Sequence, residues 1–163
     1  MRALLEIVLT ITVILVNGCA ILDEPKVTRT DDINKYKYVA ISNTGSLSSG
    51  SGTVVGNQYG VYGGSTSKSV NPGLVIEGIL LKKGFTSINE IRPEIVDKTL
   101  IVKYGESGKR EVAGGLGRYT LEATISFINA KTYGNVYTCT AEGQGTTEAD
   151  SIREAIARCL SGL

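Results

Sequence analysis

The alternation of apolar and polar residues along the chain predicts a sheet built mainly of antiparallel strands. The strongest signal lies at residues 119–127, where apolar side chains occupy every second position and threonine, glutamate or serine stands between them. A strand with one apolar and one polar face is typical of an antiparallel sheet with one open side. Weaker strand patterns occur at residues 36–41, 85–88, 99–104, 110–113 and 136–142.

Two segments have the periodicity and end signals of amphipathic helices. Asn71 is a favoured N-cap, Pro72 suits the first helical position, and Gly84 stands where a left-handed C-cap is expected. Thr147 and Asp150 have capping-box spacing at the start of the second helix. One face of that helix is apolar: Ile152, Ala155, Ile156, Cys159, Leu160 and Leu163. The predicted fold class is therefore α+β, a mainly antiparallel four- to five-stranded sheet with two helices packed on one face.

Residues 43–69 are rich in glycine and serine and have two interpretations. One is a loop, because glycine loses more backbone freedom on folding than other residues do. The other is a long hairpin, since runs of β-forming residues flank a candidate turn at Gly56 and Asn57. A loop or a poorly ordered hairpin is favoured, with a partner-binding element as the alternative. A further turn is expected at residues 106–108.

The amino terminus has the pattern of a secretory signal. Arg2 is followed by an apolar run at residues 7–16, which is too short to span a bilayer comfortably. The four residues Val16-Asn17-Gly18-Cys19 then resemble a bacterial lipobox. This resemblance implies cleavage before Cys19, diacylglycerol on its sulfur and usually a further acyl chain such as palmitate on the new amino terminus. An ordinary exported protein and a membrane helix ending near the cysteine are the alternatives.

The predicted domain boundaries follow from this processing. Residues 1–18 form the signal peptide, residues 19–34 form a polar lipid-anchored tether, and residues 35–163 form a single periplasmic domain. Among lipoproteins of Gram-negative bacteria, an aspartate after the acylated cysteine commonly retains the protein at the inner membrane. The residue here is Ala20, so the resemblance implies the outer membrane, with the protein held on the periplasmic face by its acyl chains.

The chain has three cysteines, and the anchor uses one of them. Cys139 lies on a predicted strand and Cys159 on the helix that follows it. If the helix folds back over its strand, both sulfurs arrive at similar heights, because strand and helix rises are about 3.3 and 1.5 Å per residue. A disulfide between them is favoured in the oxidising periplasm, and two buried free thiols are the alternative.

Composition argues against an enzyme, a metal site or a nucleic-acid binder. The absence of histidine removes the commonest general base and metal ligand, and a formal charge of +1 offers no basic footprint. The glycine runs at residues 114–117 and 143–147 are interpreted as a strand connection and a strand-to-helix turn, not as phosphate loops. The dispersed acidic residues are interpreted as solvated charges: Asp97, Glu106, Glu111 and Glu122. We expect no catalytic residue, no metal and no cofactor.

The carboxy-terminal pattern carries a weak family resemblance. Residues 136–139 on the returning strand and residues 141–152 at the start of the last helix resemble small accessory outer-membrane lipoproteins, and are similar to the assembly lipoproteins of the curli-secretion type. The resemblance spans residues 70–163 and implies a sheet covered by two helices. No functional residue is carried over from it.

Together these features favour a non-catalytic outer-membrane lipoprotein that acts as an envelope assembly or interaction component. Its partner is either another envelope protein or further copies of itself, with the glycine-rich segment and the polar sheet face as contact surfaces. The alternative is a periplasmic lipoprotein that binds a small ligand or glycan through tyrosines, which would require them to gather on an exposed surface. The candidates are Tyr59, Tyr62, Tyr104, Tyr119 and Tyr133.

Overall fold

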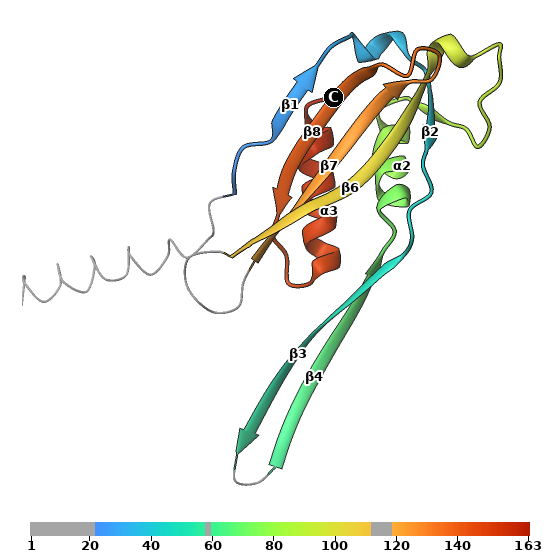
Figure 1. Cartoon of the computed structure of the whole chain (residues 1–163). Coiled ribbons are helices and arrows are strands. Elements are labelled where there is room, and N and C mark those ends of the chain that lie inside the picture. Colours follow the sequence, from blue (N-terminus) through green and yellow to red (C-terminus); the bar gives the residue numbers. More distant parts are fainter. Residues whose placement is uncertain (1–21, 58–59, 112–118) are drawn as a thin grey trace, which may run out of the picture.

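A computed structural model describes residues 22–57, 60–111 and 119–163, with only the backbone path given for residues 49–57, 60–67, 111 and 119. A six-stranded sheet forms the centre of the molecule (Figure 1). Its order is β1-β8-β7-β6-β2-β5, and a separate two-stranded sheet pairs β3 with β4. The strands of the main sheet are β1 (Lys26–Arg29), β2 (Tyr38–Ile41), β5 (Thr86–Ser87), β6 (Thr99–Glu111), β7 (Tyr119–Asn129) and β8 (Asn135–Gly143).

The sheet is mixed and larger than the sequence predicted. The long strands β6, β7 and β8 and the edge strand β1 pair antiparallel, as expected. The strand β2, however, pairs parallel with both β5 and β6. A parallel neighbour requires a crossover connection, and here the helix between β2 and β5 provides it. The prediction of a mainly antiparallel sheet was therefore correct, whereas the prediction of four to five strands was wrong.

The face of β7 that was predicted to be apolar is the centre of the core. Leu121, Ala123, Ile125 and Phe127 have no exposed surface, and Tyr137 and Cys139 of β8 pack on the same side. Both α-helices of the described chain, α2 (Pro72–Lys82) and α3 (Glu148–Ser161), cover this face (Figure 1). No helix among the described residues is both long and apolar enough to cross a membrane.

The predicted helix ends are confirmed. The Asn71 side chain accepts a hydrogen bond from the Leu74 backbone N–H, and Gly84 has the positive φ of a left-handed C-cap, +92°. The Thr147 side chain accepts a hydrogen bond from the Asp150 backbone N–H at the start of α3. The apolar face of α3 is buried as predicted, whereas Leu163, which was predicted to share that face, lies beyond the end of the helix and is partly buried.

The glycine-rich segment forms a hairpin of two long strands, β3 (Leu47–Asn57) and β4 (Gly60–Val70). Their register runs without a shift from Leu47 opposite Val70 to Asn57 opposite Gly60. Gly56 and Asn57 are therefore the last residues of β3 and not the turn that the sequence predicted. The hairpin extends beyond the helix-covered sheet, with α3 beside its base (Figure 1).

Two other segments differ from their sequence interpretation. Residues 106–108 were predicted to form a turn, but β6 continues through them and absorbs one extra residue as a bulge between Glu106 and Gly108. Residues 26–29 lie within the expected tether, yet they form β1 and pair with β8. The folded structure thus reaches further toward the amino terminus than the predicted boundary at residue 35.

Candidate interaction surface

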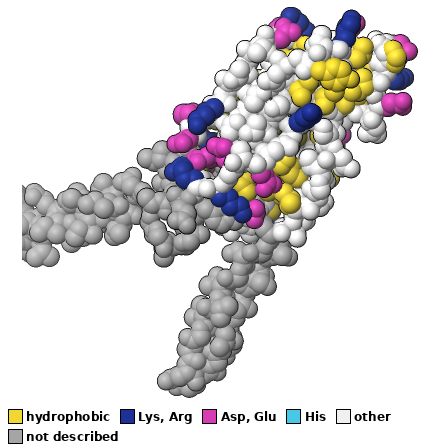
Figure 2. Space-filling model, in the orientation of Figure 1, with side chains coloured by type: hydrophobic (Ala, Val, Ile, Leu, Met, Phe, Trp, Pro, Cys, Tyr) yellow, Lys and Arg dark blue, Asp and Glu magenta, His cyan; other side chains and the backbone are white. Residues whose placement is uncertain are grey.

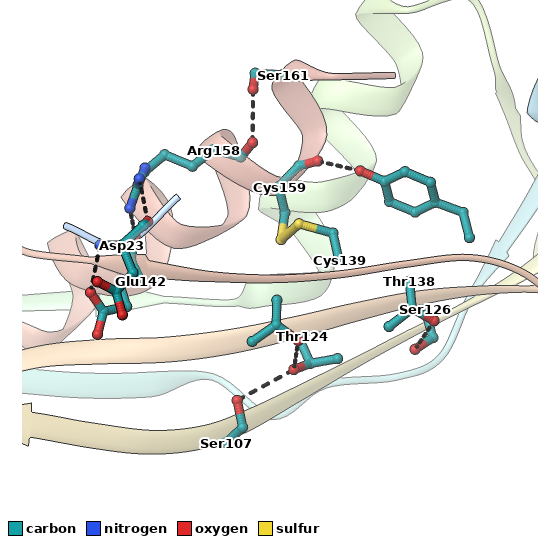
Figure 3. The surroundings of a disulfide bond; sticks show 12 residues. Asp23, Ser107, Thr124, Ser126, Thr138, Cys139, Glu142, Arg158, Cys159 and Ser161 are labelled. Carbon is teal, nitrogen blue, oxygen red and sulfur yellow. Dashed lines mark hydrogen bonds between the residues drawn. A yellow bond between two sulfur atoms is a disulfide. The ribbon is translucent and has the colours of Figure 1, made fainter. Parts of the chain in front are cut away.

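Hydroxyl side chains line the sheet face that points away from the helices. The hydroxyl oxygens of Thr124 on β7 and Thr140 on β8 are 2.8 Å apart, and Ser107 on β6 continues this row 3.3 Å from Thr124 (Figure 3). A second row joins Ser126 to Thr138 at 3.4 Å. This hydroxyl face, which consists of Ser107, Thr124, Ser126, Thr138 and Thr140, is the polar sheet face that the sequence predicted. It offers donors and acceptors in a regular array.

A buried carboxylate lies at one end of this face. The Glu142 side chain is 7% exposed and accepts hydrogen bonds from Arg110 Nε at 2.8 Å and Arg110 Nη2 at 2.7 Å. The Thr120 hydroxyl donates to the same carboxylate at 3.1 Å, and the Asp23 backbone N–H donates to it at 3.1 Å. These donors, Arg110 first, hold the pKa of Glu142 at about 2, against an ordinary value of 4.5. The carboxylate therefore stays charged at neutral pH.

The same site fastens the amino-terminal segment to α3. Arg158 of α3 donates from Nη1 to the Glu142 backbone carbonyl and from Nη2 to the Asp23 backbone carbonyl, both at 2.7 Å (Figure 3). Asp23 is thus held through its N–H by Glu142 and through its carbonyl by Arg158. We call this set of contacts among Asp23, Glu142 and Arg158 the amino-terminal clamp. The sequence did not predict these contacts, because nothing in the local pattern around Asp23, Glu142 or Arg158 indicates that they meet.

The base of the hairpin is tied to the start of α3. Lys68 Nζ lies 2.8 Å from a carboxylate oxygen of Asp150, and Arg153 Nη2 donates to the Ser69 carbonyl at 2.7 Å. The hydrogen bonds from Lys68 and then from Thr146 and Thr147 lower the pKa of Asp150 to about 2. Asp150, which was predicted to take part in the cap of the helix, therefore also binds Lys68 and holds the base of the hairpin against α3.

The structure brings Cys139 and Cys159 together in a disulfide, with their Cα atoms 5.5 Å apart (Figure 3). Cys139 is on β8 and Cys159 is near the end of α3, at the matching heights that strand and helix rises predicted. The buried Tyr137 hydroxyl donates to the Cys159 carbonyl at 2.8 Å and supports the same contact. Cys19 lies outside the described residues.

Two backbone N–H groups of the turn at residues 143–147 donate to side chains of α3. The Gly145 N–H donates to Ser151 Oγ at 2.9 Å, and the Gln144 N–H donates to Glu154 Oε2 at 2.7 Å. A Cβ added to Gly143 would lie 2.0 Å from the Ser151 carbonyl oxygen, so strand and helix are in close contact here. The interpretation as a strand-to-helix turn is consistent with these contacts. The glycine run at residues 114–117 lies outside the described residues.

The acidic candidates are dispersed over the described part of the fold and form no metal site there. Asp97 pairs with Lys131 at 2.7 Å, and Glu106 accepts a hydrogen bond from Tyr104 at 3.2 Å. Glu122 lies on the open face of β7, and the side chain of Glu111 is outside the described set. No group of three histidine, cysteine or acidic residues within metal-binding range exists in the described part of the chain.

The tyrosines whose side chains the structure describes do not gather on one surface. Tyr104 packs against the core from β6, and this burial raises the pKa of its hydroxyl. Tyr133, 76% exposed, lies in the turn between β7 and β8. The side chains of Tyr59, Tyr62 and Tyr119 lie outside the described set. The described side chains therefore include no exposed cluster of the candidate tyrosines, which the glycan-binding alternative would require.

A shallow cavity of about 200 Å³ opens where β2, β5 and the start of α2 meet. Ser42, Asn43, Asn71, Glu77 and Asn89 contribute polar groups to its wall. The Asn71 and Thr44 side chains already accept the first helical N–H groups, from Leu74 and Gly73 respectively. The backbone N–H groups of Gly73 and Leu74 are therefore already hydrogen-bonded within the fold.

Comparison with solved structures identifies a related fold. A leucine-to-methionine variant of PelC from Paraburkholderia phytofirmans, solved as a dodecamer, superposes with a TM-score of 0.51 at 12% sequence identity. The match covers 86% of this chain and 96% of the PelC chain. A second crystal form of the PelC dodecamer aligns with a TM-score of 0.46, 14% identity, and coverage of 85% and 97%. No protein-family model and no curated protein sequence matches the chain.

Proposed function

We propose that the protein is a non-catalytic component of the bacterial outer membrane that assembles with further copies of itself. The observation that carries this proposal is the fold shared with PelC, a protein of similar extent that was solved as a dodecamer. Homo-oligomers with closed symmetry are the commonest assemblies of soluble domains, and they need one surface on each copy that fits another.

Two features of the described chain supply surfaces for such contacts. The hairpin of β3 and β4 has no third strand among the described residues, and an isolated two-stranded hairpin is at best marginally stable in water. On α2, Leu74 and Leu81 are seven residues apart and therefore share one helix side, and they are 65% and 49% exposed. A neighbouring copy that covered the hairpin and this helix side would bury both.

Crosslinking in intact cells tests the proposal. With an amine-reactive reagent, we expect a ladder of products at multiples of the mass of one chain, and linked peptides that both derive from this protein. Products that contain a different envelope protein and no second copy would contradict self-association. A lysine-free tagged variant of the protein serves as the negative control.

The anchor is part of the proposal, with acyl chains on Cys19 and Ala20 directing the protein to the outer membrane. We expect Cys19→Ser to prevent cleavage by the lipoprotein pathway and to leave the protein out of the outer-membrane fraction. The disulfide should be unchanged, because it joins Cys139 and Cys159 and not Cys19. Membrane fractionation and the intact mass of the product check this. A mature wild-type mass without added lipid would contradict the anchor.

A further inference from the structure

The outer side of α2 is unusually apolar for the surface of a helix. Residues 72–82 contain only two charged side chains, Glu77 and Lys82, and the remaining positions are apolar residues, glycine or proline. One side of α2 packs into the core, whereas Leu74 and Leu81 on the opposite side are exposed. A helix with apolar residues on all sides is normally buried on all sides. The outer side of α2 is therefore a surface that a partner would cover.

Gly78 lies between the two leucines on this side, four residues after Leu74 and three residues before Leu81. Glycine within a helix lowers stability by about 1 kcal/mol relative to alanine. A Cβ added to Gly78 would meet nothing within 4 Å, so packing within the described chain does not require the glycine. A second helix, in contrast, can approach α2 most closely where no side chain stands between the two backbones.

The spacing of these residues is that of a seam between two helices. In the seven-residue repeat of paired helices, Leu74 and Leu81 take position d and Gly78 takes position a. Glu77 then takes position g and Lys82 takes position e, on the two flanks of the seam. In a parallel pair related by a two-fold axis, Glu77 of each copy faces Lys82 of the partner subunit, whereas an antiparallel pair would bring the two Glu77 side chains together. The charges therefore favour the parallel arrangement.

The two flanking charges of α2 form no ion pair within the described part of the chain. Elsewhere, acidic and basic side chains lie near one another on the face that Figure 2 shows, and several form ion pairs, such as Lys109 with Glu148 at 3.1 Å. Glu77 is partly exposed and Lys82 is exposed, so both side chains are accessible to a second copy. The outer side of α2 thus carries both members of an ion pair that two copies can complete.

We propose that two copies of the protein pack through the outer sides of their α2 helices, which run parallel and are related by a two-fold axis. In this contact Leu74 and Leu81 pack against their counterparts, and the helices are closest at Gly78. Glu77 and Lys82 of the two copies form two symmetric ion pairs at the rim. The inference rests on the proposed self-association and names one of the surfaces that carry it. Because α2 is short, the contact joins copies that also meet at a second surface, which allows an assembly larger than a dimer.

Gly78→Leu tests the contact in the mature, lipidated protein after mild extraction from the membrane. The leucine enters open space within its own chain, so the circular dichroism spectrum should be unchanged, but the leucine holds two α2 helices apart. Loss of a two-fold contact should give a species with at most half the mass of the wild-type assembly in native mass spectrometry. Gly105→Leu is the matched control, because a Cβ at Gly105 also meets nothing within 4 Å, and this variant should keep the wild-type mass.

Charge reversal tests the parallel orientation. Glu77→Lys leaves only positive charges on the two flanks and Lys82→Glu leaves only negative ones. Each single variant should therefore need a roughly tenfold higher protein concentration for half of the chains to assemble. The double variant Glu77→Lys with Lys82→Glu restores opposite charges with the signs exchanged, and it should recover the wild-type midpoint. Sedimentation velocity at low salt measures these midpoints.

The outcomes separate this contact from self-association as such. A wild-type assembly whose mass is unchanged by Gly78→Leu would overturn the α2 contact alone, and so would an equal loss of mass in Gly105→Leu. A double charge variant that assembles as weakly as the single variants would overturn the parallel arrangement. A wild-type protein that is monomeric at every concentration would overturn the proposed self-association and the α2 contact together.

Discussion

Gly143→Ala should prevent stable folding or lower the free energy of unfolding by at least about 3 kcal/mol. The added Cβ would lie 2.0 Å from the Ser151 carbonyl oxygen and 2.6 Å from the Ala155 backbone nitrogen. Both contacts are with the backbone of α3, so a side-chain rotation cannot relieve them. Relief would require α3 to move off β8, which would pull on the disulfide and the clamp together. Urea unfolding followed by circular dichroism measures the effect.

Gly105→Ala is the matched control for that substitution. Gly105 is also a strand glycine, but a Cβ added there meets nothing within 4 Å. The free energy of unfolding of the Gly105→Ala variant should stay within about 0.5 kcal/mol of the wild-type value. Equal stability of Gly143→Ala and wild type would show that α3 does not approach β8 as closely as described.

Reduction of the disulfide should lower the free energy of unfolding by about 3 kcal/mol, because the bond closes a loop between residues 20 apart in the unfolded chain. The unfolded state then gains the conformational freedom that the bond removes. Urea unfolding of the wild-type protein with and without a thiol-free reductant measures the difference.

The double variant Cys139→Ala with Cys159→Ala separates the bond from other effects of the reductant. The double variant should already have the lower free energy of unfolding of the reduced protein, and the reductant should not change it further. Wild-type unfolding that is unaffected by the reductant would contradict a contribution of the disulfide. A decrease in the double variant on reduction would point to an effect of the reductant itself.

The parts of the fold that the sequence predicted correctly are those with local signals. Asn71 and Thr147 cap the helices with their own side chains, so their roles are visible within four residues. The strand at residues 119–127 alternates strictly because one side faces the helices and the other faces solvent. The pairing of Cys139 with Cys159 depends on one strand and the helix that follows it, which is still a local relation.

The incorrect predictions share a different origin, since long-range pairing decided the structure. Residues 26–29 are exposed and, apart from Val27, polar, and they form a strand because the β8 edge pairs with them. Glycine at position 108 suggested a turn, yet pairing with β7 carries β6 onward through a bulge. The parallel arrangement of β2 depends on the crossover through α2, which the strand pattern at residues 36–41 does not reveal.

The clamp could not be predicted for a related reason. Asp23 and Glu142 are 119 residues apart, and a lone acidic or basic residue in a polar segment most often remains solvated. In retrospect, the one sign in the sequence is that Glu142 is the single charged residue of β8. Without the fold, the contacts of Asp23 would have remained hidden within the expected tether.

The most direct test of the account is the mass of the mature, lipidated protein after mild extraction from the outer membrane. Native mass spectrometry or sedimentation equilibrium should give one dominant species at an integral multiple of the mass of one chain, larger than a dimer, as the proposed self-association predicts. A single monomeric species over the full range of protein concentrations would contradict the proposed self-association.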